Sequence, residues 1–497
     1  MSTERIVVGV DVGSGAARAA AFTAHGRALG EPAQVPYELP PGLPEGWAEV
    51  DPERWRTATT AAVRALAEHV DLSRAVGVGI STVFPAAVAM DENGSPLRPA
   101  ILYCDQRSGD QVTWLADRGL DREIEGLTGN RVAPGTAAVT SWLWLRDHEP
   151  EMFAHARWLG HANTYLAHWL TGGVFMDVTN ASISGLLDPA RREWASALID
   201  QVGLPTAAFP PVVESSSPAG VVTDDAARET GLPAGIPVAI GAGDTLCATL
   251  GAGAVEAGQA FMTTGTTDTI CVCLDRCAFD RRLYLCCHAV AHRWVSIAPM
   301  SCTGGCLAWF REVMAPDADY GDLIAEAADA EPARLTFLPY LRGERSPIWD
   351  PDARGVFAGL SLASRRGDLT RAILEATGYM LRHNLEAIED AHAMRISRVT
   401  IAGRPSSSPT WNQIRADASG RALVALAYAD MAARGAALLG GMAAGVADPA
   451  IWAEGIDRGA AELAPRPELA ERYGCGYRRY LDLYAAVAGP PTAGEPA

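Results

Sequence analysis

Two segments of the same form, one in each half of the chain, constrain its fold more than any other feature. In the first, an apolar run from Ile6 to Asp11 is followed by a turn from Gly13 to Gly15 and a second apolar run from Ala17 to Thr23. In the second, the residues from Gly258 to Leu274 have the pattern of a strand, a Gly-Thr turn and another strand. Each pattern predicts a β-hairpin whose tip consists of small residues and carries a hydroxyl group. The match is too short to be a sequence repeat, but two homologous halves would leave such a pair behind.

The rest of the chain alternates strand and helix patterns, which predicts an α/β fold. Pro52 follows Asp51, and this pair is typical of a helix that begins with an N-cap. The last of the predicted helices is rich in small residues and suited to close packing. The predicted strands are Ala75 to Thr82 and Ala86 to Asp91, and the predicted helices are Pro52 to Val70, Leu369 to Ala391 and Met431 to Gly445.

The length of 497 residues fits two or three domains, and the paired hairpins favour two. A predicted strand, Gly-rich turn and helix, from Leu232 to Gly253, precede the second hairpin. We therefore expect a first domain at residues 1–245 and a second at residues 246–487. Residues 488–497 are rich in Pro and Gly and are expected to form a mobile tail.

The formal net charge of −18 argues against non-specific binding to nucleic acid, because the phosphates would be repelled. It does not exclude a small anionic ligand, which responds to local charge. The N-terminal segment lacks the apolar core of a signal peptide, and no stretch approaches the ~20 uninterrupted apolar residues of a membrane span. We therefore expect a cytoplasmic protein with no nucleic-acid or membrane partner.

The ten cysteines form no CxxC pair, and His288 and His292 complete no familiar zinc spacing. The run from Ile270 to Leu274 is typical of a buried strand, in which cysteine serves as a small apolar residue. Reduced thiols in the core are therefore expected rather than a metal site.

The two hairpin tips are candidates for phosphate binding. A glycine-rich tip exposes backbone N–H groups that can hold phosphate oxygens, and the hydroxyls of Ser14 and Thr266 could add hydrogen bonds. Two such tips could clamp a polyphosphate between two domains. Asp11, at the end of the first strand, could hold Mg²⁺ through water. A plain β-hairpin turn is the alternative for each tip.

Asp244 is the second candidate carboxylate. It lies among glycines directly after an apolar strand, a position that suits a general base for a substrate hydroxyl. The alternative is an N-cap of the helix that follows. The segment from Phe337 to Ser361 combines charged residues, prolines and aromatics within an otherwise apolar region. Such a composition indicates a loop that something must hold in place.

Taken in order, these motifs resemble the FGGY family of carbohydrate kinases, which belong to the actin-like, hexokinase-like superfamily. The resemblance covers nearly the whole chain. The motifs that carry it are Gly9 to Arg18, Gly46 to Trp55, Tyr103 to Ser108, Asp177 to Asp188, Gly241 to Gly253, Thr263 to Asp268, Pro339 to Leu360 and Trp411 to Asp417.

The resemblance implies two ribonuclease-H-like α/β domains with a catalytic cleft between them, and transfer of the ATP γ-phosphoryl group to a sugar hydroxyl. ATP and Mg²⁺ would bind mainly to the second domain and the sugar mainly to the first. Asp244 matches the family's catalytic base, and Asp11 matches the acidic residue near the metal. The implied nucleotide-binding residues are Gly13, Ser14, Arg18, Gly265, Thr266, Gly304, Gly403 and Arg404. The implied substrate-binding residues are Phe84, Pro85, Asp105, Arg107, Asp244 and Thr245.

Four positions depart from the family pattern. Residues 13–15 read Gly-Ser-Gly where the family usually has Gly-Thr-Thr or Gly-Thr-Ser, and Gly403-Arg404-Pro405 replaces a usual glycine triplet. Residues 82–85 read Thr-Val-Phe-Pro where xylulose kinases typically have a Gln-Met-His-Gly-like turn, and Thr245 stands where Asn or Gln is common. Proline removes an N–H group and arginine adds bulk and charge, so the second change bears on nucleotide affinity.

The sugar stays open at this point. The leading hypothesis is a kinase of a ketopentose, similar to xylulose kinases, and the alternative is a gluconate or polyol kinase of the same family. A carboxylate substrate would need a cation, for which Arg107 is the nearest candidate, although a structural ion pair is the alternative role for it. A hypothesis of another class is a sugar- or nucleotide-binding regulator that has lost catalysis. The family also suggests a homodimer.

Overall fold

The computed structural model describes residues 4–428, 430–456 and 462–488. Its internal contacts divide the chain into two compact units. Unit 1 consists of Met1–Ala257, Cys273–Ser296 and Asp430–Ile456, and unit 2 consists of Gly258–Val272, Ile297–Ala429 and Asp457–Ala497. The first segment of unit 1 therefore ends at Ala257, whereas the sequence predicted a domain boundary near residue 245. Unit 1 also includes two later segments, Cys273–Ser296 and Asp430–Ile456. Of the predicted tail, residues 489–497 lie outside the described residues.

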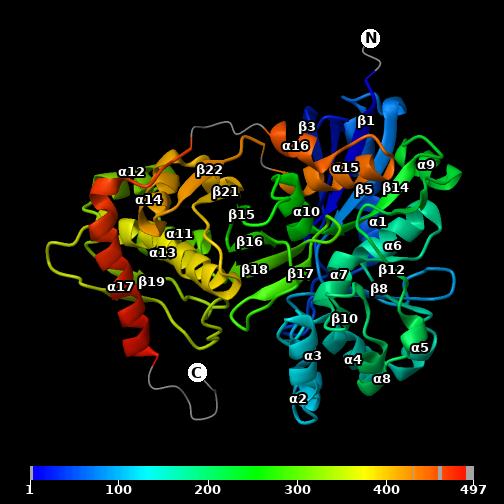
Figure 1. Cartoon of the computed structure of the whole chain (residues 1–497), viewed down its shortest axis with the longest axis horizontal. Helices are drawn as coiled ribbons and strands as arrows, with labels where there is room; N and C mark the ends of the chain where they lie inside the picture. Colours follow the sequence, from blue (N-terminus) through cyan, green and yellow to red (C-terminus); the bar gives the residue numbers. More distant parts are fainter. Residues whose placement is uncertain (1–3, 429, 457–461, 489–497) are drawn as a thin grey trace. The chain divides into compact units, whose positions relative to one another are not determined.

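Unit 1 contains a six-stranded sheet in the order β13-β14-β5-β1-β2-β3 and a four-stranded sheet in the order β4-β7-β6-β8 (Figure 1). Its strands are β1 (Ile6–Val12), β2 (Ala16–Thr23), β3 (Ala28–Pro36), β4 (Glu49–Val50), β5 (Ala75–Thr82), β6 (Ala86–Met90), β7 (Ala100–Leu102), β8 (Trp158–His161), β9 (Met176–Asp177), β10 (Leu187–Asp188), β11 (Glu193–Trp194), β12 (Val212–Val213), β13 (Pro218–Val221), β14 (Pro237–Gly243) and β17 (Tyr284–Cys287). Its helices are α1 (Pro52–Ala67), α2 (Gly109–Ala116), α3 (Leu120–Thr128), α4 (Ala138–His148), α5 (Pro150–Ala154), α6 (Ala162–Thr171), α7 (Val178–Ile183), α8 (Ser196–Gln201), α9 (Asp224–Thr230), α10 (Asp244–Gly251), α15 (Met431–Ala443) and α16 (Pro449–Glu454).

The predicted first hairpin is confirmed. β1 and β2 pair antiparallel from Ile6 opposite Thr23 to Val12 opposite Ala17, and every residue of β1 is buried. β1 also pairs with β5, and β5 with β14, both in parallel. A strand buried on both faces needs an unbroken apolar run, which is the pattern that β1 has.

Unit 2 contains most of a second six-stranded sheet, whose order is β17-β18-β16-β15-β21-β22. Its elements are β15 (Ala260–Thr263), β16 (Asp268–Leu274), β18 (Trp294–Met300), β19 (Thr336–Leu338), β20 (Val356–Ala358), β21 (Arg398–Ala402), β22 (Ala422–Ala425), α11 (Gly304–Met314), α12 (Tyr320–Asp329), α13 (Arg366–His392), α14 (Pro409–Ser419) and α17 (Ala470–Val487). The boundary between the units falls within β16 and within β18.

The two sheets share one topology. β15 and β16 form the predicted second hairpin, and β15 pairs in parallel with β21, which pairs in parallel with β22. This repeats the arrangement of β2, β1, β5 and β14 in unit 1. The prediction of two related ribonuclease-H-like α/β domains is therefore confirmed at the level of the fold.

Helix α15 packs against β1 and β5 of the unit 1 sheet (Figure 1). A Cβ atom added to Gly9 of β1 would lie 1.9 Å from the backbone oxygen of Ala433. One added to Gly435 of α15 would lie 1.9 Å from the backbone oxygen of Cys247 in α10. Only glycine permits an approach in which backbone meets backbone. The predicted close packing of this small-residue helix is thus confirmed.

The other predicted elements are also present. α1 begins at Pro52, and the side chain of Asp51 accepts a hydrogen bond from the Glu53 N–H at 3.0 Å. The helix ends at Ala67, three residues before the predicted end. Cys271 and Cys273 of β16 are buried, as the apolar pattern of that strand predicts. Among the described helices, none combines the length and apolarity that crossing a membrane requires.

Helix α17 packs on the core through tyrosines, and the sequence patterns did not predict this helix. Three of its tyrosines, Tyr473, Tyr477 and Tyr480, are buried and pack around Tyr379 of α13. The hydroxyl of Tyr480 also shares a 2.5 Å hydrogen bond with that of Tyr340. An aromatic face of this kind replaces the aliphatic stripe that usually marks a core-facing helix.

We predict that Gly435→Ala destabilises unit 1. Alanine favours a helix over glycine by about 1 kcal/mol, but the new methyl group would collide with the Cys247 carbonyl, and overpacking of this kind costs about 1–3 kcal/mol. Gly474→Ala in α17 is the matched control, because an added Cβ there meets nothing within 4 Å. The control should gain stability. Denaturant unfolding followed by tryptophan fluorescence and circular dichroism checks both, and a stabilised Gly435→Ala variant would contradict the close packing.

Candidate active site

Three parallel strands of unit 1 bring the predicted catalytic residues to one edge of the sheet. Val12 of β1 lies opposite Thr82 of β5, and Thr82 lies opposite Gly243 of β14. Asp11 therefore stands one residue before the end of its strand, and Asp244 directly follows the end of β14. The carboxyl ends of parallel strands are where α/β sheets place their ligands.

Asp11 is buried and engages both of its carboxylate oxygens. Oδ1 accepts a hydrogen bond from Ser81 Oγ at 2.7 Å, and Oδ2 lies 3.2 Å from an Arg18 guanidinium nitrogen. Burial, reinforced by the negative charges of Asp430 and Asp244, raises the pKa of Asp11 to about 7. The single cation Arg18 does not compensate for this burial and this charge.

Asp430 is a site residue that sequence reasoning missed. Its side chain accepts a hydrogen bond from the Ala433 N–H at 3.2 Å, and so it caps α15. Its Oδ2 atom lies 3.8 Å from Nε of Arg18, the cation that also pairs with Asp11. The available signal was an aspartate directly before a small-residue helix, which is an N-cap pattern.

This group of carboxylates fits a hard divalent cation. Asp11 and Asp430 share one arginine, and the surplus negative charge is what a bound cation with oxygen ligands would balance. Among the residues that the structure describes, no group of three or more His, Cys, Asp or Glu side chains is arranged to hold a metal. A magnesium ion here would therefore take most of its ligands from water and phosphate, as Mg²⁺ commonly does.

Asp244 is the first residue of α10, and Gly243 occupies the N-cap position. The N-cap role that the sequence left open for Asp244 is therefore absent. Its Oδ1 accepts hydrogen bonds from the N–H and the hydroxyl of Thr245, at 2.6 and 3.2 Å. Burial nevertheless raises the pKa of Asp244 to about 6. A carboxylate with that pKa is ionised at neutral pH and still basic enough to accept a proton.

The predicted substrate turn lies against the strand that leads to Asp244. A Cβ added to Gly243 would lie 2.5 Å from the ring of Phe84. Pro85 is buried, and the next residue, Ala86, donates its N–H to Nδ1 of His161 at 3.2 Å. The structure thus brings Phe84 and Pro85 together with Asp244 and Thr245.

A buried polar cluster binds the backbone of β14 near its end, just before Asp244. The Thr179 hydroxyl accepts a hydrogen bond from the Gly243 N–H at 2.9 Å, and Asn163 donates to the Ile240 carbonyl at 3.3 Å. Both side chains also contact the carboxylate of Asp177, which is fully buried. The sequence placed Asp177 and Thr179 in a motif but assigned them no role. Their contacts hold the backbone that positions Asp244.

Asp105 and Arg107 form a separate cluster with Glu49. The Arg107 side chain is 1% exposed and binds Asp105 at 2.7 Å and Glu49 at 2.5 Å. Its guanidinium also lies 3.5 Å above the ring of Trp47. Each of its three side-chain nitrogens thus donates a hydrogen bond to a protein carboxylate. The structural ion pair that the sequence left as the alternative role of Arg107 is therefore present.

The nucleotide-binding candidates of unit 2 meet in three adjoining turns. Gly304 donates its N–H to the Gly265 carbonyl at 3.1 Å, and Thr303 donates to the Thr266 carbonyl at 3.0 Å. Gly403 has φ of +125°, and a Cβ there would lie 2.0 Å from the Thr264 backbone oxygen. Glycine is thus required at 403 for both space and conformation.

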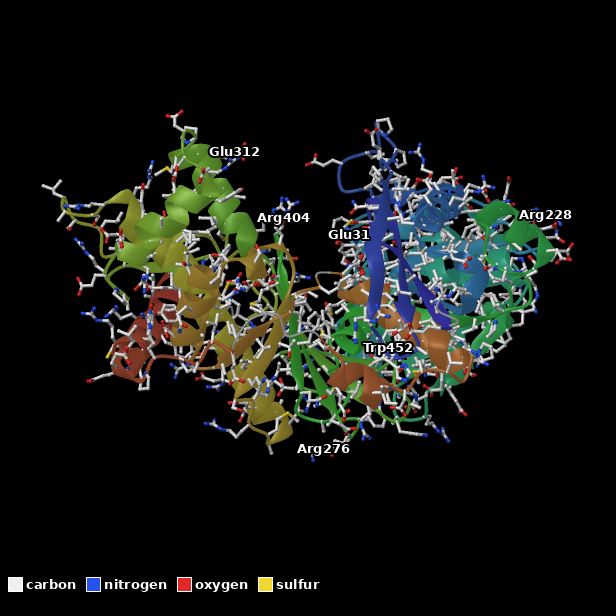
Figure 2. The ribbon with its side chains drawn as sticks, turned by 90° about the horizontal axis from the view of Figure 1, so that it is seen from above. Glu31, Arg228, Arg276, Glu312, Arg404 and Trp452 are labelled. Carbon is white, nitrogen blue, oxygen red and sulfur yellow. The ribbon has the colours of Figure 1, made fainter. Side chains whose placement is uncertain are left out.

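The departure at Arg404 and Pro405 produces a short 3₁₀ turn, Arg404–Ser407. The turn is closed by the N–H and the hydroxyl of Ser406, which donate to the Gly403 carbonyl at 3.1 and 2.7 Å. The Arg404 side chain is exposed and projects away from the ribbon (Figure 2). Proline is tolerated here because the first turn of a helix needs no N–H at this position.

In the first hairpin, the tip is closed by the Gly13 N–H, which donates to the Ala16 carbonyl at 3.0 Å. Ser14 and Gly15 are exposed at the tip. Tyr37 supports the turn, because its hydroxyl donates to the Gly13 carbonyl. The predicted residues Gly13, Ser14 and Arg18 thus surround the end of β1, beside Asp11.

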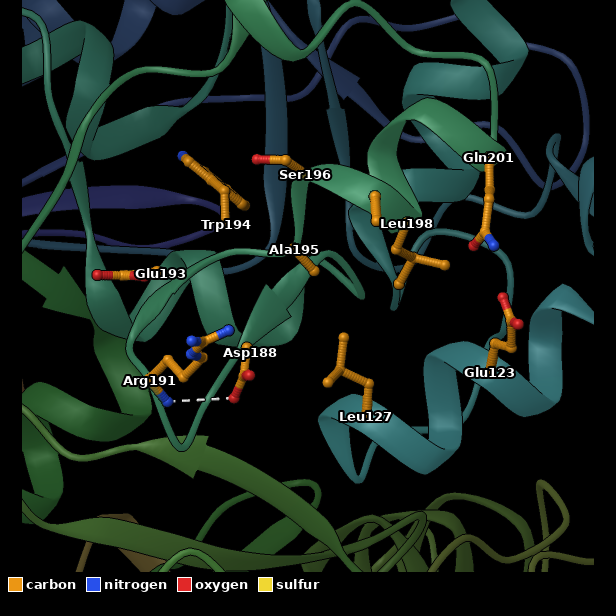
Figure 3. A pocket seen from close by; sticks show the side chains of 11 residues that line it. Glu123, Leu127, Asp188, Arg191, Glu193, Trp194, Ala195, Ser196, Leu198 and Gln201 are labelled. Atoms are coloured by element: carbon orange, nitrogen blue, oxygen red, sulfur yellow. Dashed lines mark hydrogen bonds between the residues drawn. The ribbon is translucent and has the colours of Figure 1, made fainter.

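A pocket of about 590 Å³ lies elsewhere in unit 1 (Figure 3). Its lining includes Leu127, Trp194 and Leu198 together with the loop at Asp188, whose carboxylate accepts the Arg191 N–H at 3.1 Å. None of the predicted site residues lines it. We therefore do not assign the predicted chemistry to this pocket.

Comparison with known proteins decides the family. Residues 6–251 match the N-terminal domain of the FGGY family of carbohydrate kinases, and residues 260–444 match its C-terminal domain. The chain belongs to the FGGY family of carbohydrate kinases. It is therefore a phosphotransferase, and FGGY kinases use ATP.

Named relatives of this FGGY kinase act on different sugars. Xylulose kinase of Escherichia coli (strain K12) is 31% identical over 420 residues, which cover 84% of this chain and 85% of that protein. Gluconokinase of Bacillus subtilis (strain 168) is 25% identical over 460 residues, 89% of this chain and 88% of that protein. The crystal structure of a xyloylose kinase from Brucella ovis matches with a TM-score of 0.90 and 31% identity, over 97% of this chain and 99% of that one.

We predict that Arg107→Met destabilises unit 1 by about 3–5 kcal/mol, because it leaves the carboxylates of Asp105 and Glu49 buried without a cation. The control is Arg228→Met, whose pair with Asp225 is exposed on both sides and should contribute less than about 1 kcal/mol. Thermal unfolding compares the two variants. If Arg107→Met instead melted like the control and only raised the KM for an acidic sugar, Arg107 would be a substrate residue.

Proposed function

We propose that this FGGY kinase transfers the γ-phosphoryl group of ATP to a hydroxyl of a ketopentose. The observation that carries the proposal is the strand register that places Asp11, the Thr82–Pro85 turn and Asp244 at one edge of the unit 1 sheet. A base, a metal-binding carboxylate and a substrate turn are the parts that such a transfer requires.

Asp244 is the proposed general base. At the start of α10 the residue is half-buried rather than enclosed in the core, so a sugar hydroxyl can reach it. The hydrogen bonds from Thr245 hold the Oδ1 atom. We assign proton removal to the carboxylate and its orientation to Thr245. The hydroxyl oxygen then attacks the γ-phosphorus while ADP leaves.

We assign the binding of Mg²⁺ to Asp11. Most ligands of the ion would be water molecules and phosphate oxygens. When bound there, Mg²⁺ would balance the negative charge of the phosphates. Within the chain, Ser81 fixes one oxygen of Asp11 and Arg18 lies beside the other. Arg18, Gly13 and Ser14 are the proposed phosphate contacts of unit 1, and Gly265, Thr266, Gly304, Gly403 and Arg404 are the proposed nucleotide contacts of unit 2.

The choice of sugar has support from relatives and from the first unit. Curated relatives at about 30% identity that match this chain are xylulose kinases. An aldonic acid would need a cation, and Arg107, the candidate for that role, is buried and already pairs with two carboxylates, Asp105 and Glu49. The turn Thr82-Val83-Phe84-Pro85 provides a ring and a proline beside Asp244, which suits an uncharged sugar.

We predict that Asp244→Asn lowers kcat by about 10²–10⁴-fold, since asparagine cannot accept the proton. The pKa of about 6 is above the ordinary value, so the folded protein carries a charge that burial disfavours. Removing this charge should leave the melting temperature unchanged or higher. Wild-type kcat/KM should be full at pH 8 and fall as the pH drops through about 6.

Asp11 would add to the same acid limb, because its pKa is also raised. Raising the Mg²⁺ concentration should move the part due to Asp11 to lower pH and leave the part due to Asp244 in place. Asp225→Asn, an exposed aspartate, is the control for the substitution itself. A fully active Asp244→Asn variant would refute the assignment of the base.

A coupled ADP-release screen with ATP and Mg²⁺ over pentuloses, polyols and aldonates tests the substrate class. We expect kcat/KM to be highest, by tenfold or more, for a ketopentose. A preference for gluconate or for a polyol would overturn the ketopentose assignment and leave the kinase assignment intact. Turnover of no sugar, together with no binding of ATP, would favour a regulator without catalysis.

A further inference from the structure

Unit 2 contains a buried ion pair that has no role in the function proposed above. Nη2 of Arg415 lies 3.0 Å from Oδ2 of Asp268, and both side chains are only 1% exposed. Asp268 is the first residue of β16, and Arg415 lies in α14. The sequence placed both residues in motifs but assigned chemistry to neither.

Asp268 holds both of the turns that contain nucleotide-binding candidates. Its Oδ1 atom accepts a hydrogen bond from the Gly265 N–H at 3.1 Å and another from the Thr303 hydroxyl at 2.7 Å. Thr303 immediately precedes Gly304, the first residue of α11. One carboxylate oxygen therefore fixes the tip of the second hairpin relative to the start of α11.

Arg415 is held in turn by two long helices. Its Nε atom donates to the Thr377 hydroxyl of α13 at 3.2 Å, and its guanidinium lies 5.2 Å from the Trp411 ring centroid. The Trp411 indole donates to the same hydroxyl at 3.1 Å. Through its ion pair with Asp268, Arg415 thus connects the two turns to helices α13 and α14 in the interior of unit 2.

This pair is a poor device for stability alone. Burial disfavours both charges, since it raises the pKa of Asp268 and lowers that of Arg415. Nη1 of Arg415 is buried with no hydrogen-bond partner in the described structure. Well-packed apolar residues often replace buried ion pairs without loss of stability. What an apolar pair could not do is accept the Gly265 N–H and the Thr303 hydroxyl together.

We propose that Asp268 and Arg415 are positioning residues for the phosphates of ATP. Asp268 sets the geometry of the Gly265–Thr266 and Thr303–Gly304 turns, and Arg415 cancels the negative charge that would otherwise repel the phosphates. The proposal rests on the proposed function, which assigns these turns to the nucleotide. Neither side chain touches ATP in this role, and each acts through the backbone of the turns.

Isothermal titration compares a non-hydrolysable ATP analogue with Mg²⁺ and AMP, which lacks the β- and γ-phosphates. Asp268→Ala, which removes the acceptor of both turns, and Arg415→Met, which leaves the Asp268 charge without its cation, should each weaken analogue binding by tenfold or more and change AMP binding by less than twofold. Thr303→Val keeps the ion pair and removes one bond to a charged group, and should weaken analogue binding by about tenfold. It decides the matter if either charge variant fails to fold.

Glu375→Ala is the matched control. Glu375 forms a similarly buried pair with Arg371, 2.8 Å apart, in the same unit, and contacts Tyr473 rather than the turns. The control should lower the melting temperature as much as Asp268→Ala does and leave the binding of both nucleotides unchanged. If the two variants lose analogue affinity equally, the Asp268–Arg415 pair is merely structural and the proposal falls.

Thr266→Ala separates this proposal from the function on which it rests. If Thr266→Ala weakens the analogue while Asp268→Ala and Thr303→Val do not, the positioning role is wrong and the phosphate site stands. If none of these three variants weakens the analogue, the turns do not bind phosphate, and both the site assignment and the positioning role are overturned.

Discussion

The approach of backbone to backbone between α15 and its neighbours is the constraint on which the catalytic edge of unit 1 depends. Gly9 and Gly79 face the Ala433 and Ala436 carbonyls across distances that leave no room for a Cβ. Because β1 and β5 pack directly on the backbone of α15, the N-terminus of α15 lies near the carboxyl ends of these strands. Asp430, which caps α15, consequently lies near Arg18 and Asp11. The glycine-mediated packing of α15 therefore also brings the carboxylate of Asp430 close to Asp11.

The buried carboxylates at the two candidate sites differ in how far a cation balances them. In unit 1, Asp11 and Asp430 share Arg18, and burial raises the pKa values of Asp11 and Asp244. In unit 2, Asp268 has its own arginine and two neutral donors. A surplus of carboxylate suits a site that takes up a cation and a proton. A neutralised carboxylate suits one that must hold a fixed shape beside an anion.

Local patterns predicted much of the fold because the decisive interactions are local. The hairpin at β1 and β2, the Asp51 cap of α1 and the small-residue helix α15 each follow from residues close in sequence. Asp244 could be identified as a candidate, but its place at N1 rather than at the N-cap could not, because that shift depends on how β14 ends. Asp430, Thr179 and the Asp268–Arg415 pair were missed because their partners are distant in sequence. The aromatic face of α17 was missed because tyrosines replace the usual aliphatic residues.

Three arginines show why motif membership alone does not give a role. Arg107 lies in a family motif, yet its guanidinium is enclosed by Asp105, Glu49 and Trp47. Arg415 is equally enclosed, but its partner Asp268 reaches the nucleotide turns, so a structural ion pair can shape a binding site indirectly. Arg404, the residue that departs from the family pattern, is exposed. Of the three, it alone presents its guanidinium to solvent. The departure from the glycine triplet therefore removes one N–H group, at Pro405, and adds one exposed cation, at Arg404. If the departure affects ATP binding, charge on Arg404 rather than loss of the loop's geometry is the physical route, since Ser406 closes the turn without the missing N–H.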